Sequence, residues 1–238
     1  MPTLEVSYSP DLYQFYRNDD AIVVVIDVFR ATSAICTAFE HGIKSMIPVE
    51  HIEQALDFKK QGFIVAAERK GEVVDGFQLG NSPFHYMDEK LKGETTVITT
   101  TNGTRAIEVS KEAHQVIIGS FLNISAVCNY LAEENRDVLL LCAGWKGRYN
   151  MEDSLFAGAV VNNLIDRGTS YDLSDSATSA NLLFESSKGD LNGFLKSSSH
   201  RRRLGRLDLE KDIEFCLQSD YTNVIPVLEN DRLIRLNK

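Results

Sequence analysis

The sequence has little of several features that would assign it to a common class of protein. Its four cysteines are scattered and form no C-x-x-C pair, so we expect neither a disulfide framework nor a thiolate zinc site. No apolar run approaches the roughly 20 residues that a membrane-spanning helix needs. The N-terminal stretch MPTLEVSYSP has no basic segment followed by an apolar one, which argues against a secretory signal. These absences predict a cytoplasmic protein that does not bind membranes.

Positive charge is scarce as well. The 238 residues include 25 Lys and Arg against 34 Asp and Glu, which gives a formal net charge of −9. Proteins that bind nucleic acids normally present a basic surface, so we expect no nucleic-acid partner. An acidic protein can still bind a small anion, provided that its cations converge at one place.

The sequence does contain a regular alternation of apolar strands and helical segments. Several strands are apolar on both faces, which is typical of a sheet covered on each side. This alternation predicts an α/β fold, a three-layer α/β/α arrangement with a largely parallel, mixed sheet. We expect strands at 4–8, 21–27, 45–49, 63–67, 95–100, 115–120 and 137–143, and helices at 51–61, 104–112, 123–135 and 152–167.

The last third of the chain is less regular. Residues 168–206 are rich in serine and asparagine and contain the basic run HRRR, and we expect them to form a helical or loop excursion. We interpret the whole chain, 1–238, as a single α/β domain. Beyond the excursion we expect a helix near 207–218 and two short paired strands at 222–229 and 231–237.

Polar turns follow several of the strands. The sequence has no Walker GxxxxGK[ST] and no GxGxxG, but four segments carry charged and hydroxyl side chains: DVFRATS (27–33), ERKGEVVDGFQLGNSP (68–83), TTTNGTR (99–105) and CAGWKGRYNMED (142–153). In open α/β sheets, ligands bind beyond the carboxyl ends of the strands, where helix N-termini direct free amide groups at them. We therefore expect the four turns to meet and form one site.

The residue types in these turns favour phosphoryl chemistry with a metal ion. Hydroxyl, amide and cationic side chains suit a multiply anionic ligand, and carboxylates would repel it unless a divalent cation lay between them. Hard oxygen ligands beside phosphate indicate Mg²⁺. We predict Asp27, Glu68, Glu152 and Asp153 as metal ligands, and Asp27, Arg30, Arg105 and Glu152 as catalytic residues. For substrate binding we predict Thr32, Ser33, Arg69, Asn81, Thr101, Asn102, Gly103, Thr104, Lys146 and His200.

Ordinary structural roles would also explain many of these residues. Asp27 could cap the turn after its strand, and Thr32 and Ser33 could be helix N-caps. The acids at 152–153 could simply favour the first turn of a helix. The HRRR run could be a solvated helix face.

Four longer segments follow one another along the chain: VVIDVFRATSAICTAFEHG (24–42), AAERKGEVVDGFQLGNSP (66–83), TTTNGTRA (99–106) and LCAGWKGRYNMEDSLFAGAVV (141–161). Together with a looser match through 197–231, they resemble the 2-phosphosulfolactate phosphatases of coenzyme M biosynthesis and their bacterial relatives. The resemblance implies an α/β, Mg²⁺-dependent phosphatase that hydrolyses (2R)-O-phospho-3-sulfolactate to (2R)-3-sulfolactate and phosphate. The implied partner is therefore a small anionic phosphoester.

Two other functions are alternatives at this point. A non-catalytic module that binds an anionic metabolite would bind its ligand without turnover and without a metal. A hydrolase with Cys142 as its nucleophile would be inactivated by alkylation and indifferent to chelators. Within the phosphatase hypothesis, direct attack by water and a phosphoenzyme on Asp27 are both open. Enzymes of this size and class often form homo-oligomers, and we expect this chain to be capable of it.

Overall fold

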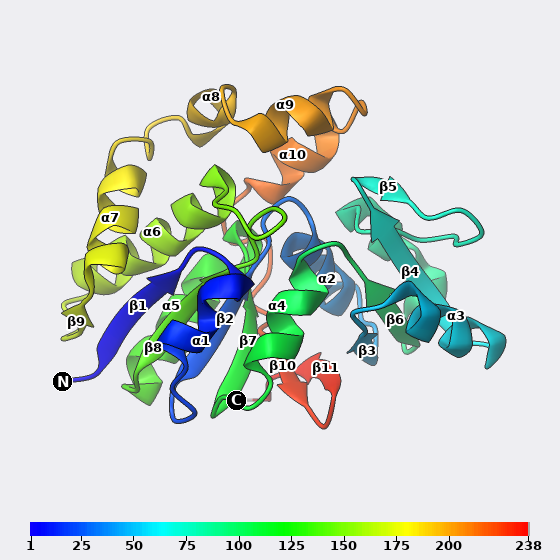
Figure 1. The fold of residues 1–238 in the computed structure, drawn as a ribbon, viewed down its shortest axis with the longest axis horizontal. Helices are drawn as coiled ribbons and strands as arrows, with labels where there is room; N and C mark the ends of the chain where they lie inside the picture. The colour runs from blue at the N-terminus through cyan, green and yellow to red at the C-terminus, as the bar shows by residue number, and fades with distance from the viewer. Residues whose placement is uncertain (238) are drawn as a thin grey trace.

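The computed structural model describes residues 1–237 and shows a three-layer α/β/α arrangement (Figure 1). Within this range one mixed, mostly parallel sheet of 11 strands forms the middle layer, in the order β5-β4-β6-β3-β11-β10-β7-β2-β8-β1-β9. The fold class expected from the sequence is therefore confirmed. The strands are β1 (Thr3–Ser7), β2 (Ile22–Ile26), β3 (Ser45–Pro48), β4 (Ile64–Arg69), β5 (Glu72–Val73), β6 (Thr95–Thr99), β7 (Gln115–Gly119), β8 (Val138–Cys142), β9 (Asp172–Leu173), β10 (Pro226–Glu229) and β11 (Arg232–Arg235).

Helices cover both faces of this sheet. They are α1 (Tyr13–Tyr16), α2 (Ala31–Glu40), α3 (Ile52–Lys60), α4 (Gly103–Ser110), α5 (Ile124–Glu134), α6 (Met151–Asp166), α7 (Asp175–Glu185), α8 (Leu191–Leu195), α9 (Ser199–Gly205) and α10 (Glu210–Cys216). Strand β2 shows why two faces are needed, because all five of its residues are buried. Val24 lies in one apolar cluster with α5 and α6, whereas Val23 and Val25 lie in another with α2 and α4. The period-2 alternation of a strand thus fills both cores.

Two groups of parallel strands make up most of the sheet. β7, β2, β8, β1 and β9 form one group, and β3, β6 and β4 form the other. The antiparallel β10–β11 hairpin lies between them. Val227 of β10 pairs with Ile117 of β7, and Leu233 of β11 pairs with Met46 of β3. The C-terminal hairpin thus joins the two halves of the sheet.

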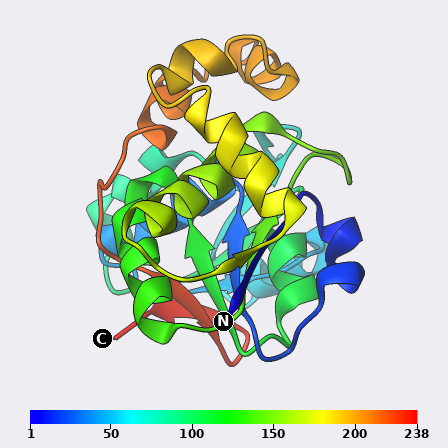
Figure 2. The same ribbon diagram turned by 90° about the vertical axis from the view of Figure 1, so that its left-hand side faces the viewer.

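The excursion at 168–206 is mainly helical. Figure 2 shows α7 beside α6, and Gly158 permits this close approach, since a Cβ there would lie 2.0 Å from the Ala180 carbonyl oxygen. Helix α9 is capped by Ser198, whose hydroxyl accepts the Arg201 N–H at 3.0 Å, as N-cap serines do. The excursion therefore extends the helical layer and then carries α9 toward the ends of the strands.

The local predictions agree closely with this structure. The seven strands expected before residue 150 are present with ends within two residues, and the four expected helices are present with the same accuracy. The final hairpin also forms, with both strands shorter than expected. The two-residue strands β5 and β9 were not predicted. No helix in the described part of the chain is long and apolar enough to cross a membrane.

Candidate functional site

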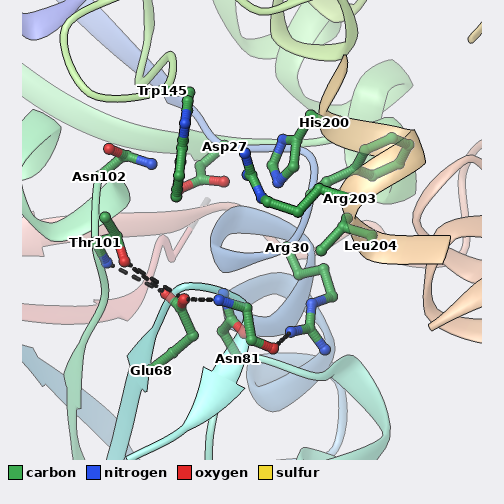
Figure 3. A pocket seen from close by; sticks show the side chains of 12 residues that line it. Asp27, Arg30, Glu68, Asn81, Thr101, Asn102, Trp145, His200, Arg203 and Leu204 are labelled. Atoms are coloured by element: carbon green, nitrogen blue, oxygen red, sulfur yellow. Dashed lines mark hydrogen bonds between the residues drawn. The ribbon is translucent and has the colours of Figure 1, made fainter. Parts of the chain in front are cut away.

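A small cavity lies where the carboxyl ends of several strands meet (Figure 3). Its volume is about 20 Å³, which is room for about one water molecule. Residues from all four polar turns line it, and helix α9 closes it. The lining consists of Asp27, Phe29 and Arg30 after β2, Glu68, Gly71 and Asn81 from β4 and the segment that follows, Thr101 and Asn102 after β6, Trp145 after β8, and His200, Arg203 and Leu204 from α9.

Asp27 is the carboxylate with the fewest partners in this cavity. Its main chain is fixed by Thr32, because the Asp27 N–H donates to the Thr32 hydroxyl at 3.1 Å and the Asp27 carbonyl accepts the Thr32 N–H at 3.0 Å. Its side chain faces the first residue of α4, where a Cβ on Gly103 would lie 2.9 Å from Oδ2. No donor within residues 1–237 forms a hydrogen bond with the carboxylate. Burial raises the pKa of this carboxyl well above its usual range, Asp153 raises it further, and His200 lowers it.

Asp153 ties two of the turns together. Its Oδ1 accepts the Val28 N–H at 2.8 Å, and its Oδ2 accepts the Gly144 N–H at 3.1 Å and the Asn150 side-chain amide at 2.8 Å. Burial, followed by repulsion from Glu152, raises the pKa of Asp153 to about 8, although these three donors lower it. All of its hydrogen bonds hold the loops after β2 and β8 in place.

Glu152 lies beside Asp153 in the first turn of α6 and pairs with a residue of the excursion. Its Oε1 is hydrogen-bonded to His200 Nδ1, and its Oε2 is buried without a partner. The His200 ring stacks on Trp145 at a centroid distance of 5.9 Å and meets Phe29 edge-on at 6.1 Å. These contacts fix the imidazole and leave Nε2 as the nitrogen free to act in the cavity.

Glu68 joins the ends of β4 and β6. Its oxygens accept hydrogen bonds from the Gly71 N–H and from both the N–H and the hydroxyl of Thr101. Figure 3 shows these bonds on the lower side of the cavity. Both Glu68 oxygens are therefore engaged within the chain.

Arg30 is the most buried cation of the site. Its Nη1 donates to Asp212 Oδ1 at 2.8 Å and its Nη2 donates to the Gly71 carbonyl at 2.6 Å, while Nε is buried without a partner. Nearby, Asn81 has its side-chain carbonyl oxygen Oδ1 buried without a partner. Unsatisfied buried polar atoms in a native site need an explanation, and a bound ligand supplies one.

Several hydroxyls predicted to bind substrate are occupied by neighbouring main-chain groups. The Ser33 hydroxyl donates to the Val28 carbonyl at 2.9 Å, and the Thr104 hydroxyl donates to the Thr100 carbonyl at 3.1 Å. Thr32 holds Asp27 as described above. These three side chains are buried and do not line the cavity, so in this structure they position the turns.

The other predicted cationic residues also form contacts of their own. The Arg69 guanidinium donates to the carbonyls of Glu50 and Glu68 and to the Thr99 hydroxyl, outside the cavity. Arg105 forms an ion pair with Asp11 and is also outside the lining. Lys146 has its ammonium over the Trp145 ring, 5.4 Å from the centroid, and its main-chain N–H donates to Asn102 Oδ1 at 3.3 Å.

Five lining residues were not predicted: Phe29, Gly71 and Trp145 lie within the predicted turns, and Arg203 and Leu204 lie on α9. The HRRR run is not a solvated face, because His200 and Arg201 are buried and His200, Arg203 and Leu204 all line the cavity. Their spacing of three and four residues places them on one face of α9. That spacing was the only local signal, and it does not indicate what the helix packs against.

Cys142 lies in the apolar core below the cavity. It is fully buried, it does not line the cavity, and burial raises the pKa of its thiol well above the usual value. The thiolate is the nucleophilic form of cysteine. Its position therefore does not favour a cysteine-dependent hydrolase.

The contacts of the four carboxylates show which of their oxygens are available to a metal ion. Among the described residues no group of three or more His, Cys, Asp or Glu is arranged to hold a metal ion. Asp153 and Glu68 have both oxygens engaged, whereas Asp27 is free and Glu152 keeps one free oxygen. Mg²⁺ commonly takes only one or two carboxylates together with water and phosphate oxygens. The residues thus fit a Mg²⁺ ion for which Asp27 would be the protein ligand, and the mutual repulsion of the acids would favour a cation there.

The fold and the cavity define an α/β protein with a charged site for a small anionic ligand at the ends of its strands. The chain belongs to the 2-phosphosulfolactate phosphatase family, whose model matches residues 8–231, and which comprises phosphoric monoester hydrolases. It is 47% identical over 207 residues to a probable 2-phosphosulfolactate phosphatase of Thermotoga maritima, covering 87% of this chain and 88% of the relative. Relatives with the same description from Caldanaerobacter subterraneus (40% over 212 residues, 87% and 88% covered) and Clostridium acetobutylicum (39% over 214 residues, 89% and 91% covered) are also similar.

Proposed function

We propose that this protein is a Mg²⁺-dependent phosphatase that hydrolyses (2R)-O-phospho-3-sulfolactate to (2R)-3-sulfolactate and phosphate. Family membership supports the reaction class. The observation that carries the proposal within the chain is the free Asp27 carboxylate, buried in a cavity that also contains Arg30 and Arg203. Cations around a free carboxylate suit a phosphoester bound through a divalent metal.

In this proposal Asp27 would hold Mg²⁺, and a bound Mg²⁺ would supply charge neutralisation and polarisation of the phosphoryl group. Asp153 and Glu68 keep the loops around Asp27 in position through the hydrogen bonds described above. Arg30 is fixed by Asp212 and Gly71, and its free Nε–H is available to a phosphoryl oxygen. Fixed donors of this kind stabilise developing charge without reorganising during the reaction.

The His200–Glu152 pair moves the proton in the proposed reaction. Water attacks phosphorus and gives one of its two protons to His200 Nε2, the bond between phosphorus and the ester oxygen breaks, and Nε2 passes this proton to the leaving alkoxide, while the water oxygen and its other proton remain on the phosphate. Glu152 orients the imidazole through Nδ1, so Nε2 can donate or accept that proton, as histidine does when its other nitrogen is held by a carboxylate. Direct attack by water leaves Asp27 free to hold the metal throughout.

Cysteine chemistry supports a cytoplasmic location within this proposal. All four cysteines are free thiols in buried positions. Free thiols are the usual state of cysteine in the reducing cytoplasm.

A phosphate-release assay with added Mg²⁺ or EDTA tests the proposed function. We expect turnover that requires Mg²⁺ and that is lost in Asp27→Asn. Near-normal, Mg²⁺-dependent rates in Asp27→Asn would refute the assignment of Asp27. Saturable binding of the ester without turnover in any metal would instead support a non-catalytic metabolite-binding protein.

A further inference from the structure

The four side chains of the basic run HRRR (200–203) in α9 make different contacts. His200 is hydrogen-bonded to Glu152, and Arg201 forms an ion pair with Glu210 at 2.8 Å. Arg202 is exposed and donates to the Ser197 carbonyl. Arg203 lines the cavity, and its side chain forms no hydrogen bond or ion pair within the described residues. Three of the four side chains thus have hydrogen-bond partners, and the Arg203 guanidinium has none among the residues described.

The free guanidinium lies on an aromatic surface. Its central carbon is 3.5 Å from the centroid of the Trp145 ring, and its Nε is buried without a partner. Figure 3 shows Arg203 between Trp145 and His200 and beside Asp27. Burial lowers the pKa of this guanidinium from its usual value, which Glu152 and Glu68 oppose, and an arginine remains charged in proteins under such conditions. The indole holds the cation in place without using its hydrogen-bond donors.

The other cations around the cavity are not equivalent to Arg203. Arg30 has both Nη atoms engaged by Asp212 and Gly71. Lys146 contacts the same indole through its ammonium but lacks the planar fork that binds carboxylates and similar anions with two bonds. Arg203 is therefore the guanidinium of this site with its full set of donors available.

Resting on the proposed function, we propose that Arg203 binds the acid group that the substrate carries besides its phosphate, an oxyanion such as a carboxylate or sulfonate. The phosphoryl group is expected beside Asp27, at the strand ends, and Arg203 comes from α9, which closes the cavity over those ends. Arg203 thus selects phosphorylated organic acids over simple phosphate esters.

The neighbouring cavity supports this assignment. It has a volume of about 470 Å³ and shares Arg30, Gly71 and Asn81 with the site. Its wall also contains the acids Glu72 and Asp208, which would repel an organic anion, and Asp212 there is paired with Arg30. The acid group of the substrate is therefore better accommodated at Arg203 than in that larger space.

The cavity is smaller than the proposed substrate. A space of about 20 Å³ holds no organic acid, so side chains that line the site must rearrange when the substrate binds. Trp145 is the single tryptophan of the chain. Its fluorescence therefore reports directly on occupancy of the proposed acid subsite.

Kinetics with a series of substrates test the proposal. The series comprises (2R)-O-phospho-3-sulfolactate, O-phospholactate and ethyl phosphate, which has no second acid. In Arg203→Gln we expect KM to rise by about 10- to 100-fold for the two acids, the loss of one charge-assisted interaction, with little change in kcat and a much smaller rise in KM for ethyl phosphate. Arg203→Lys should lie between wild type and Arg203→Gln, and the neighbouring Arg202→Gln is the matched control. An equal loss for ethyl phosphate, or no loss for any ester, would overturn the proposal.

Binding measurements separate this proposal from the function on which it rests. Trp145 emission is titrated with (2R)-3-sulfolactate and, separately, with inorganic phosphate. We expect Arg203→Gln to weaken sulfolactate binding far more than phosphate binding, whereas Arg202→Gln changes neither. Absence of turnover in wild type would refute the proposed function alone, because these titrations need no catalysis. No response of wild type to sulfolactate, or equal weakening of both ligands in Arg203→Gln, would refute the role of Arg203.

Discussion

The imidazole of His200 and the carboxylate of Glu152 are hydrogen-bonded across the candidate site, although 48 residues separate them in the sequence. The bond joins the buried first turn of α6 to α9, a helix of the excursion. A carboxylate that holds Nδ1 sets the tautomer of the ring and supports a positive charge on it. The pair has the arrangement expected of a proton carrier.

Replacement of this pair tests the proton transfer. Glu152→Gln and His200→Gln should each lower kcat for phosphate release by about 10²- to 10⁴-fold, the usual contribution of general acid–base catalysis. The double variant should lose little more than either single one, because the two residues act as a unit. His114→Gln, at an exposed histidine, is the control, and additive losses in the double variant would contradict the pairing.

Asp27→Asn should separate activity from stability. Removing the metal ligand should lower kcat by about 10³-fold or more, since a metal ion contributes several kcal/mol to such reactions. The same change removes a buried carboxylate that has no hydrogen-bond donor, so the metal-free variant should melt at the same temperature as wild type or higher. Thermal melts of both proteins in EDTA measure this, with the exposed Asp75→Asn as control. A large drop in Tm would show that the carboxylate has a structural role.

Mg²⁺ should stabilise wild type by mass action. At a concentration 100 times its Kd, a ligand that binds the native state alone adds about 2.7 kcal/mol. We expect Tm to rise with Mg²⁺ in wild type and to stay constant in Asp27→Asn. An equal rise in both proteins would place the metal away from Asp27.

Acid should weaken the attachment of the N-terminal strand through Asp137. The Thr3 N–H donates to its Oδ1 at 2.7 Å and Asn18 donates to its Oδ2 at 3.0 Å, and these bonds, led by the one from Thr3, lower the pKa of this carboxyl. A lowered pKa in the folded state means that the stabilisation is present above the unfolded value of about 3.9 and is lost as the pH falls through the folded value. Asp137→Asn should therefore lower Tm at pH 7 by no more than about 2–4 °C.

The difference in Tm between wild type and Asp137→Asn should shrink as the pH falls below about 4. Melting curves from pH 3 to pH 7 measure it, with the exposed Asp20→Asn as control. A difference that is the same at every pH would show that the ionisation of Asp137 is not its cause.

The cysteine thiols should not react with alkylating reagents in the native protein. All four cysteines are buried, and burial raises the pKa of the thiols of Cys36, Cys128 and Cys216 to about 12. Iodoacetamide should therefore leave phosphatase activity unchanged, and a thiol reagent should detect the four groups only after denaturation. Rapid loss of activity on alkylation would revive the role of Cys142 as a nucleophile.

Local sequence patterns predicted most of the secondary structure because they reflect short-range physics. The apolar run at β2 and the spaced apolar residues of α6 specify a strand and a helix within their own lengths. The four polar turns were recognisable for the same reason, since the order of strand, turn and helix predicts where a binding site forms. The exact partners of each side chain were not part of that information.

The amino-acid sequence by itself determined the alternation of strands and helices and the family to which the chain belongs. Tertiary structure decided which polar groups are left without a hydrogen-bond partner. The Thr104 hydroxyl donates to the carbonyl of a residue only four positions away. Asp153 is hydrogen-bonded to Val28 across 125 residues of sequence, and Arg30 to Asp212 across 182. Tertiary structure also brought α9 over the strand ends and left the Arg203 guanidinium unpaired. Such long-range pairings depend on how whole layers pack, and no local periodicity encodes them.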